Sequence, residues 1–166
     1  MVEYTCGKTN IEEFSAMISL HSGEFLEIDI RKLMIPSERV AHVQVGNNLE
    51  HALLVLTKSG YTAIPVLDPH YKLHGLISTP IIMDSILGLE RIEFEQLEKK
   101  KVEEVMNITV PRVKDTASIK TCLRLLVNHP FLCVDTEDGY FEGILPRSTV
   151  LTQLNLAVNK MNKSEK

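Results

Sequence analysis

A repeat of apolar positions is the feature that most constrains how this chain can fold. Four residues have the i, i+3, i+4, i+7 spacing of one helix face: Leu49, Ala52, Leu53 and Leu56. The same spacing returns 70 residues later, at Ile119, Cys122, Leu123 and Leu126. Outside the helix the equivalent residues are Val66 and Val134, Gly75 and Gly143, and Leu33-Met34 and Val105-Met106. The sequence therefore predicts a duplication, with shorter connections in the second copy.

Within the first copy the predicted order is strand, helix, strand, strand, helix. A strand at 43–45 precedes a helix that is capped by Asn47 or Asn48 and ended by Gly60. Strands at 63–67 and 73–77 follow, joined by a turn at 68–72, and Thr79-Pro80 opens a helix that Gly88 ends. A copy of about 60 residues cannot bury its own sheet well. We therefore expect a mixed α/β (α+β) fold, in which two β-α-β-β-α repeats pack sheet against sheet with pseudo-twofold symmetry.

The predicted boundaries divide the chain into five segments. Residues 1–22 are an N-terminal extension with a helix from Asn10 to about Leu20, and 23–88 are the first repeat, which opens with a short helix at about 24–34. A charged linker helix is expected at 89–101, the second repeat at 102–160 and a disordered tail at 161–166.

Composition and motifs argue against several classes of protein. The net charge of −4 disfavours a broad nucleic-acid-binding surface, and no apolar run approaches the ~18 residues of a membrane span. The N-terminus lacks the apolar core of a signal peptide, and the three cysteines have no pairing or metal-ligand spacing, which favours a reducing cytoplasm. His70 and His74 are spaced like a helical metal pair but fall in a predicted turn, so we expect no metal. Without a Walker loop or a Ser-x-x-Lys motif, catalysis is not expected.

The corner between the first helix and its following strand, residues 60–68, is the predicted ligand wall. Gly60 can adopt the left-handed conformation that closes a helix, and Pro65 suits an edge or the beginning of a strand. The backbone groups of the intervening residues are then free to bond a flat heterocycle. We interpret this corner as one wall of an adenine-nucleotide pocket.

These features together resemble a known family. A strand and helix followed by Gly-Tyr-x-x-x-Pro-Val, a hairpin with Gly75-Leu76-Ile77-Ser78 and a second helix are similar to a CBS domain. Residues 33–157 resemble a tandem CBS pair, or Bateman module. The runs at 33–43, 45–52 and 88–95 resemble stand-alone bacterial CBS proteins that bind cyclic di-AMP.

The resemblance implies a signalling protein rather than an enzyme. Members of this family form disc-like homodimers. Cyclic di-AMP is the implied ligand, and AMP and ATP are the alternative ligands. The implied partner of the ligand-free form is the bifunctional (p)ppGpp synthetase/hydrolase of the stringent response, with pyruvate carboxylase as a further partner. Ligand binding would release the enzyme.

The resemblance also implies which residues bind the nucleotide. They are Arg39, Val40, Ala41, Tyr61, Thr62, Ala63, Ile64, Pro65, Arg147 and Ser148. CBS pairs usually place a ribose-binding aspartate near the start of the last helix of a repeat, but those positions here hold Ile81 and Thr149. A cyclic dinucleotide has its 3′ hydroxyls tied up in phosphodiesters and offers phosphates instead. Arg147, at a predicted helix N-terminus, could bind one.

Alternatives remain at the level of residues and of function. Arg147 could be an exposed first-turn arginine, Arg39 could pair with Glu38 or Asp68, and Tyr61 could be a half-buried aromatic. The second corner, residues 128–133, looks too short and is filled by Phe131 and Leu132, so one site per chain is expected. The protein could also be an AMP/ADP/ATP energy sensor, or a dimeric scaffold that needs no ligand.

Overall fold

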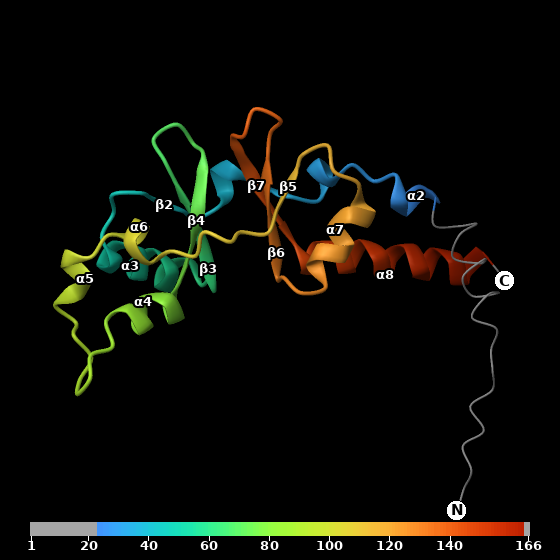
Figure 1. Ribbon diagram of the computed structural model, residues 1–166. Coiled ribbons are helices and arrows are strands. Elements are labelled where there is room, and N and C mark those ends of the chain that lie inside the picture. The colour runs from blue at the N-terminus through green and yellow to red at the C-terminus, as the bar shows by residue number, and fades with distance from the viewer. Residues whose placement is uncertain (1–22, 165–166) are drawn as a thin grey trace, which may run out of the picture.

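Two small sheets lie beside each other, each with its own helices (Figure 1). The computed structural model describes residues 23–164. The first sheet has the order β2-β3-β4, with bounds Val43–Gln44, Ala63–Leu67 and Leu73–Ser78. The second has the order β1-β7-β6-β5, with bounds Ile35–Pro36, Phe141–Pro146, Phe131–Asp135 and Arg112–Lys114.

The predicted β-α-β-β-α order is confirmed in both copies. The principal helices are α3 (Leu49–Ser59), α4 (Thr79–Ser85), α7 (Ile119–Leu126) and α8 (Arg147–Ser164). Short helices lie between them: α2 (Gly23–Leu26), η1 (Ile30–Lys32), η2 (Ser37–Arg39), α5 (Gln96–Lys99) and α6 (Val102–Val105). Asn48 is the N-cap of α3, where its side chain accepts from the backbone N–H of His51 at 3.0 Å, and Gly60 ends the helix with φ 72°.

The strand registers confirm the duplication. Val43 pairs with Val66 in the first sheet, as Val113 pairs with Val134 in the second. Each repeat has a core between its sheet and its helices. The first helical core includes Leu49, Ile64 and Ile82. The second helical core includes Ile119, Leu132 and Val150. A third cluster draws residues from both sheets, which confirms sheet-against-sheet packing. We call it the inter-sheet core, and its buried members are Val40, Leu67, Leu73, Cys133, Phe141 and Ile144.

The two repeats also exchange their leading segments, which was not predicted. β1 lies near the start of the first repeat, ahead of β2, but pairs antiparallel with β7 of the second repeat, Ile35 opposite Ile144. In the same way Asn107, near the start of the second repeat and ahead of β5, forms a bridge with Leu76 in β4 of the first. Gly143 permits the first crossing, because a Cβ there would lie 2.1 Å from the carbonyl oxygen of Ile35.

Three segments differ in secondary structure from what the sequence predicted. The linker 89–101 is not a continuous helix: only α5 is helical, and it follows a bridge between Leu87 and Ile92. The helix expected at 24–34 is split into α2 and η1, because Asp29 accepts from the N–H of Arg31 and caps η1. α8 continues to Ser164, so residues 161–164 are helical and not a disordered tail. The extension at 1–22, its helix from Asn10 and residues 165–166 lie outside the described residues.

Pro65 was expected at an edge or at the beginning of a strand, but it lies inside β3, the central strand of its sheet. It is tolerated because β2 pairs only with Val66 and Leu67, which leaves the β2 side of Pro65 without a strand partner. The missing backbone N–H of Pro65 therefore costs β3 no hydrogen bond to β2.

The two cysteines of the described residues are buried and unreactive. Cys122 and Cys133 are free and buried, and burial raises the pKa of the Cys133 thiol to about 12, so that it stays protonated at neutral pH. Cys6 lies outside the described residues.

Between residues 23 and 164, no helix is both long and apolar enough to cross a membrane.

Candidate functional site

The first-copy corner and the start of α8 lie on the same edge of the sheet pair (Figure 1). Ala63 begins β3 opposite Ser78, and Phe131 begins β6 opposite Pro146, the residue before α8. The hairpin turns lie together on the opposite edge, where the N–H of Phe141 donates to the carbonyl of Tyr71 at 2.8 Å. The predicted corner and the start of α8 therefore both lie on the edge away from the turns.

Strand alternation separates the side chains of the predicted wall. Ile64 is fully buried in the first helical core, so it can offer only backbone groups to the space between the sheets. Ala63 and Pro65 alternate with Ile64 and share their face with Leu67 of the inter-sheet core. Tyr61 is half-buried against the first helical core and Thr62 is exposed. The half-buried aromatic weighed for Tyr61 is what the structure shows.

The segment before β2 is divided between the interior and solvent. Val40 is buried in the inter-sheet core, its N–H donates to the carbonyl of Ser37 at 3.1 Å, and its carbonyl lies 3.1 Å from Nδ1 of His42. Ala41 is half-buried against the first helical core. Arg39, which precedes Val40, is exposed, and its side chain makes no hydrogen bond or ion pair with other described residues.

The alternative partners weighed for Arg39 are not used. Asp68 instead lies 3.0 Å from Nε2 of His74 and accepts backbone N–H bonds from Lys72 and His70 within its turn. The backbone N–H of Lys72 and the His74 side chain lower the pKa of the Asp68 carboxyl. Among residues 23–164 the Arg39 side chain therefore has no ion-pair partner, and Arg39 directly precedes Val40 of the inter-sheet core.

Arg147 is held by the second copy. Its backbone N–H donates to the carbonyl of Pro130 at 2.9 Å, and its guanidinium Nη1 donates to the carbonyl of Val127 at 3.4 Å. The side chain is half-buried, not the exposed first-turn arginine considered from the sequence, and Ser148 beside it is exposed. Among the described residues, no hydrogen bond or ion pair joins Arg147 to 39–41 or 61–65. The structure brings these groups to one edge without connecting them.

Neither ribose position carries a carboxylate. Ile81 and Thr149 are both half-buried, and Ile81 packs against the first helical core. A bidentate grip on a ribose diol is therefore absent at both positions. The N–H groups in the first turn of α8 have no partner inside the helix, which favours an anion at this end.

The second corner differs from the first in how it is filled. α7 ends without a glycine, at Val127 in a right-handed helical conformation. Phe131 is half-buried against the inter-sheet core and takes space between the sheets. Leu132 points the other way, into the second helical core, so the expectation that both residues fill the corner holds for Phe131 alone.

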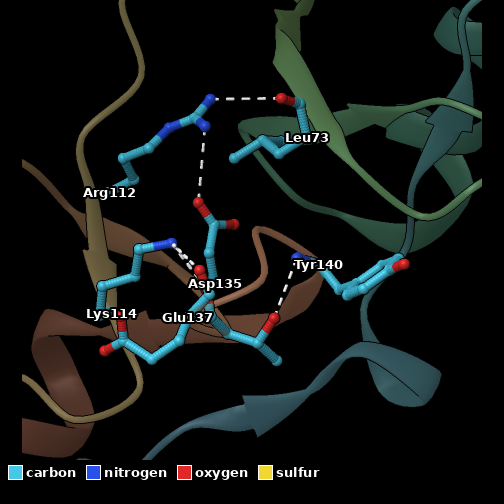
Figure 2. Close-up of polar contacts among 7 residues, drawn as sticks. Leu73, Arg112, Lys114, Asp135, Glu137 and Tyr140 are labelled. Atoms are coloured by element: carbon cyan, nitrogen blue, oxygen red, sulfur yellow. Dashed lines mark hydrogen bonds and ion pairs between the residues drawn. The ribbon is translucent and has the colours of Figure 1, made fainter.

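Sequence reasoning missed an ion pair within the second copy, between β5 and β6, whose carboxylate is buried (Figure 2). The Asp135 side chain is almost wholly buried, and its Oδ2 lies 3.5 Å from Nη1 of Arg112. Nη2 of Arg112 donates to the carbonyl of Leu73 at 3.3 Å, which ties the second copy to the first. Burial raises the pKa of Asp135, against the lowering effect of Arg112 and Lys114. The repeat offset contained a signal, because it makes this aspartate the equivalent of an apolar residue of the first copy, Leu67.

Metal-ligating side chains do not gather in the described part of the chain, which contains no group of three or more His, Cys, Asp or Glu residues able to hold an ion. The groups available for a ligand here are basic side chains, backbone amides and apolar surface.

Comparison with known proteins identifies the family to which this fold is similar. Residues 30–88 and 102–155 each match the family model of the CBS domain. A protein of Bacillus subtilis (strain 168) named cyclic di-AMP receptor B is 55% identical over 147 residues, which span 89% of this chain and 100% of that protein.

Solved structures agree with this similarity. The CbpB protein of Listeria monocytogenes in complex with c-di-AMP is 56% identical, with a TM-score of 0.74 over 80% of this chain and 98% of that one. A CBS domain-containing protein from Bacillus anthracis is 63% identical, with a TM-score of 0.75 over 80% of this chain and 96% of that one.

Proposed function

Because this chain belongs to the CBS-domain family, and within it to the relatives of cyclic di-AMP receptor B, we propose that it is a cyclic di-AMP-binding signalling protein. The observation that carries the proposal is 55% identity across the complete length of the receptor from B. subtilis. The absence of a carboxylate at Ile81 and Thr149 supports the same ligand, because a cyclic dinucleotide has fewer free ribose hydroxyls to grip.

The proposed site lies between the repeats at the edge where β3 and α8 begin. Backbone groups of residues 61–65 and of Val40 and Ala41 would contact an adenine, and Arg39 would approach a phosphate. Arg147 would exchange its long bond to the Val127 carbonyl for a charge-assisted bond to the second phosphate, with Ser148 beside it. Since Phe131 occupies the equivalent space in the second copy, the proposal is one ligand per chain.

Titration calorimetry with cyclic di-AMP, AMP, ADP, ATP and cyclic di-GMP tests the ligand. We expect cyclic di-AMP to bind with a stoichiometry near one per chain and more tightly than AMP or ATP. In thermal unfolding, ligand at 100 times Kd should add about 2.7 kcal/mol to the free energy of unfolding. AMP binding at least as tightly would make the protein an energy sensor, and no binding of any nucleotide would leave a scaffold.

The regulatory step follows from differential binding. In this proposal the ligand-free homodimer engages a partner enzyme in the cytoplasm, and cyclic di-AMP favours a geometry that releases it. The (p)ppGpp synthetase/hydrolase is the proposed partner, with pyruvate carboxylase as a further one. The proposed boundaries of the two repeats are 23–88 and 102–160.

A further inference from the structure

One hydrogen bond between strands of the second copy has no equivalent in the first. In the second copy the N–H of Cys133 in β6 donates to the carbonyl of Pro111, the residue before β5, at 2.9 Å. The repeat makes Pro65 the equivalent of Cys133 and Ala41 the equivalent of Pro111. Because proline has no backbone N–H, Pro65 cannot donate to the Ala41 carbonyl. The first sheet is therefore open at the point where the second is closed.

The strand pairing shows the same difference. β5 pairs with β6 from Arg112 onward, whereas β2 pairs with β3 only from Val43 onward. His42 and Pro65, the equivalents of Arg112 and Cys133, do not pair. Among residues 23–164, neither the backbone N–H nor the carbonyl of Ala41 makes a hydrogen bond. A donor and an acceptor are thus left unused in the segment to which the proposed site assigns the adenine.

His42 occupies the neighbouring carbonyl. Its Nδ1 lies 3.1 Å from the carbonyl oxygen of Val40, and since a carbonyl only accepts, Nδ1 carries the proton. An edge-on contact with Tyr71, at 5.7 Å between ring centroids, orients the imidazole. The N–H of Val40 donates to the carbonyl of Ser37, so both backbone groups of Val40 are used within the chain. The nucleotide segment therefore presents the backbone of Ala41 and not that of Val40.

A donor and an acceptor on one residue match the edge of adenine. The N6 amino group of adenine donates and the ring nitrogen beside it accepts, whereas guanine has the acceptor O6 in place of the amino group. The Ala41 carbonyl can accept from the amino group as long as no strand bond occupies it. In the second copy the equivalent carbonyl is occupied and Pro111 has no N–H, so that copy cannot make this contact.

We propose that Pro65 determines the base specificity of the first-copy site by keeping the Ala41 carbonyl free for the adenine amino group. The inference rests on the proposed function, because it takes cyclic di-AMP to bind beside residues 39–41 and 61–65. Pro65 is a positioning residue in this account, since it acts through the bond that its nitrogen cannot donate. The difference between Pro65 and Cys133 also gives a second reason, besides Phe131, for one ligand per chain.

Pro65→Cys tests this role, because it restores the N–H with the residue type that the second copy has at this position. The new amide should donate to the Ala41 carbonyl and weaken cyclic di-AMP binding at least about tenfold in calorimetric titration, because the carbonyl is then occupied. Slow hydrogen exchange of the residue 65 amide verifies the new bond. Pro69→Cys makes the same change at an exposed turn residue and should leave the affinity unchanged. All chains are kept reduced.

Cyclic di-IMP distinguishes an occupied carbonyl from a lost contact with the proline ring, because it has a carbonyl where cyclic di-AMP has the amino group. The wild type should bind cyclic di-AMP at least about tenfold more tightly than cyclic di-IMP. Pro65→Cys should remove most of this preference, since neither ligand can then use the Ala41 carbonyl. If Pro65 acted only by packing its ring against the base, both ligands would weaken equally and the preference would stay.

Three results would overturn the inference: equal affinity of the wild type and Pro65→Cys for cyclic di-AMP, an unchanged preference over cyclic di-IMP, or a freely exchanging residue 65 amide in a folded variant. Pro65→Ala restores the same N–H without a thiol and should give the same pattern, so a misfolded Pro65→Cys chain does not decide the outcome. Circular dichroism verifies folding. A wild type that binds no cyclic di-AMP would instead refute the proposed function.

Discussion

Arg147 is positioned by its own repeat before any ligand binds. Within the described part of the chain its guanidinium donates to one carbonyl, that of Val127, and the 3.4 Å bond is long. A phosphate offers the same guanidinium a shorter, charge-assisted bond. The structure therefore presents a basic side chain that is oriented but weakly occupied.

Replacing Arg147 with Ala should weaken cyclic di-AMP binding about 10- to 100-fold, because a hydrogen bond to a charged group contributes about 1.5–3 kcal/mol. Calorimetric titration measures the loss. Arg124→Ala is the control with the same charge change, since Arg124 is an exposed basic residue on α7 of the same repeat. Equal affinities for the two variants would remove Arg147 from the site.

Asp135 makes stability depend on pH. Burial raises the pKa of its carboxyl above the ordinary 3.8, so the native protein holds this proton more tightly than the unfolded chain does. Its contribution to the free energy of unfolding is therefore greatest below about pH 4 and falls as the pH rises through the raised value. Asp135→Leu, which restores the residue type of Leu67, should raise stability by up to about 2 kcal/mol at pH 7 and by less at pH 3.5.

Urea unfolding of both proteins at the two pH values measures this difference, and an equal difference at both would contradict the raised pKa. Arg112→Ala should lower the free energy of unfolding by about 1–3 kcal/mol at pH 7, because it leaves the buried carboxylate without its cation. In the Asp135→Leu background the same change should cost less, which a double-mutant cycle detects.

At the scale of elements, the crossing of β1 onto β7 holds the repeats together. The close approach at Gly143 means that Gly143→Ala must push β1 away from the second sheet. We expect a loss of about 1–3 kcal/mol in the free energy of unfolding, measured by denaturant titration. Gly75→Ala should cost less, because a Cβ there meets the flexible Met106 side chain at 2.8 Å and the Asn107 carbonyl at 2.9 Å. An unchanged Gly143→Ala protein would contradict the crossing.

The elements predicted from sequence are those with strong local signals. β3 has the predicted bounds, and Asn48 and Gly60 cap α3 as expected, because caps and alternation are written in neighbouring residues. The linker was mistaken for a helix because its charges resemble a solvated helix face, whereas Gly88 and the Leu87–Ile92 bridge make it a hairpin. The exchange of β1 depends on contacts more than 100 residues apart in sequence, which periodicity cannot reveal.

The same limit applies to the site. The sequence indicated the corner at 61–65 and the start of α8, and the structure sets both on one edge. It could not show that Ile64 faces a helical core or that Arg147 bonds to Val127, because both depend on how the strands are oriented in the folded chain. The Arg112–Asp135 ion pair could not be predicted for the same reason, because its two residues are 23 positions apart in the sequence.

For the whole molecule, the proposed function predicts exclusive binding of ligand and partner. A pull-down of purified (p)ppGpp synthetase/hydrolase by the ligand-free chain should succeed, and cyclic di-AMP well above Kd should reduce the captured enzyme at least about tenfold. The Arg147→Ala chain should capture the enzyme but release it only at higher ligand concentration. Capture that does not change with cyclic di-AMP would refute the release step while leaving ligand binding intact.

A crystal structure of the chain with cyclic di-AMP tests the central claim most directly. We predict one ligand per chain between the repeats, with an adenine against the backbone of residues 61–65 and the Arg147 guanidinium turned from Val127 to a phosphate. A ligand bound elsewhere, or a cleft that stays empty at saturating cyclic di-AMP, would contradict the assignment of this edge as the nucleotide site.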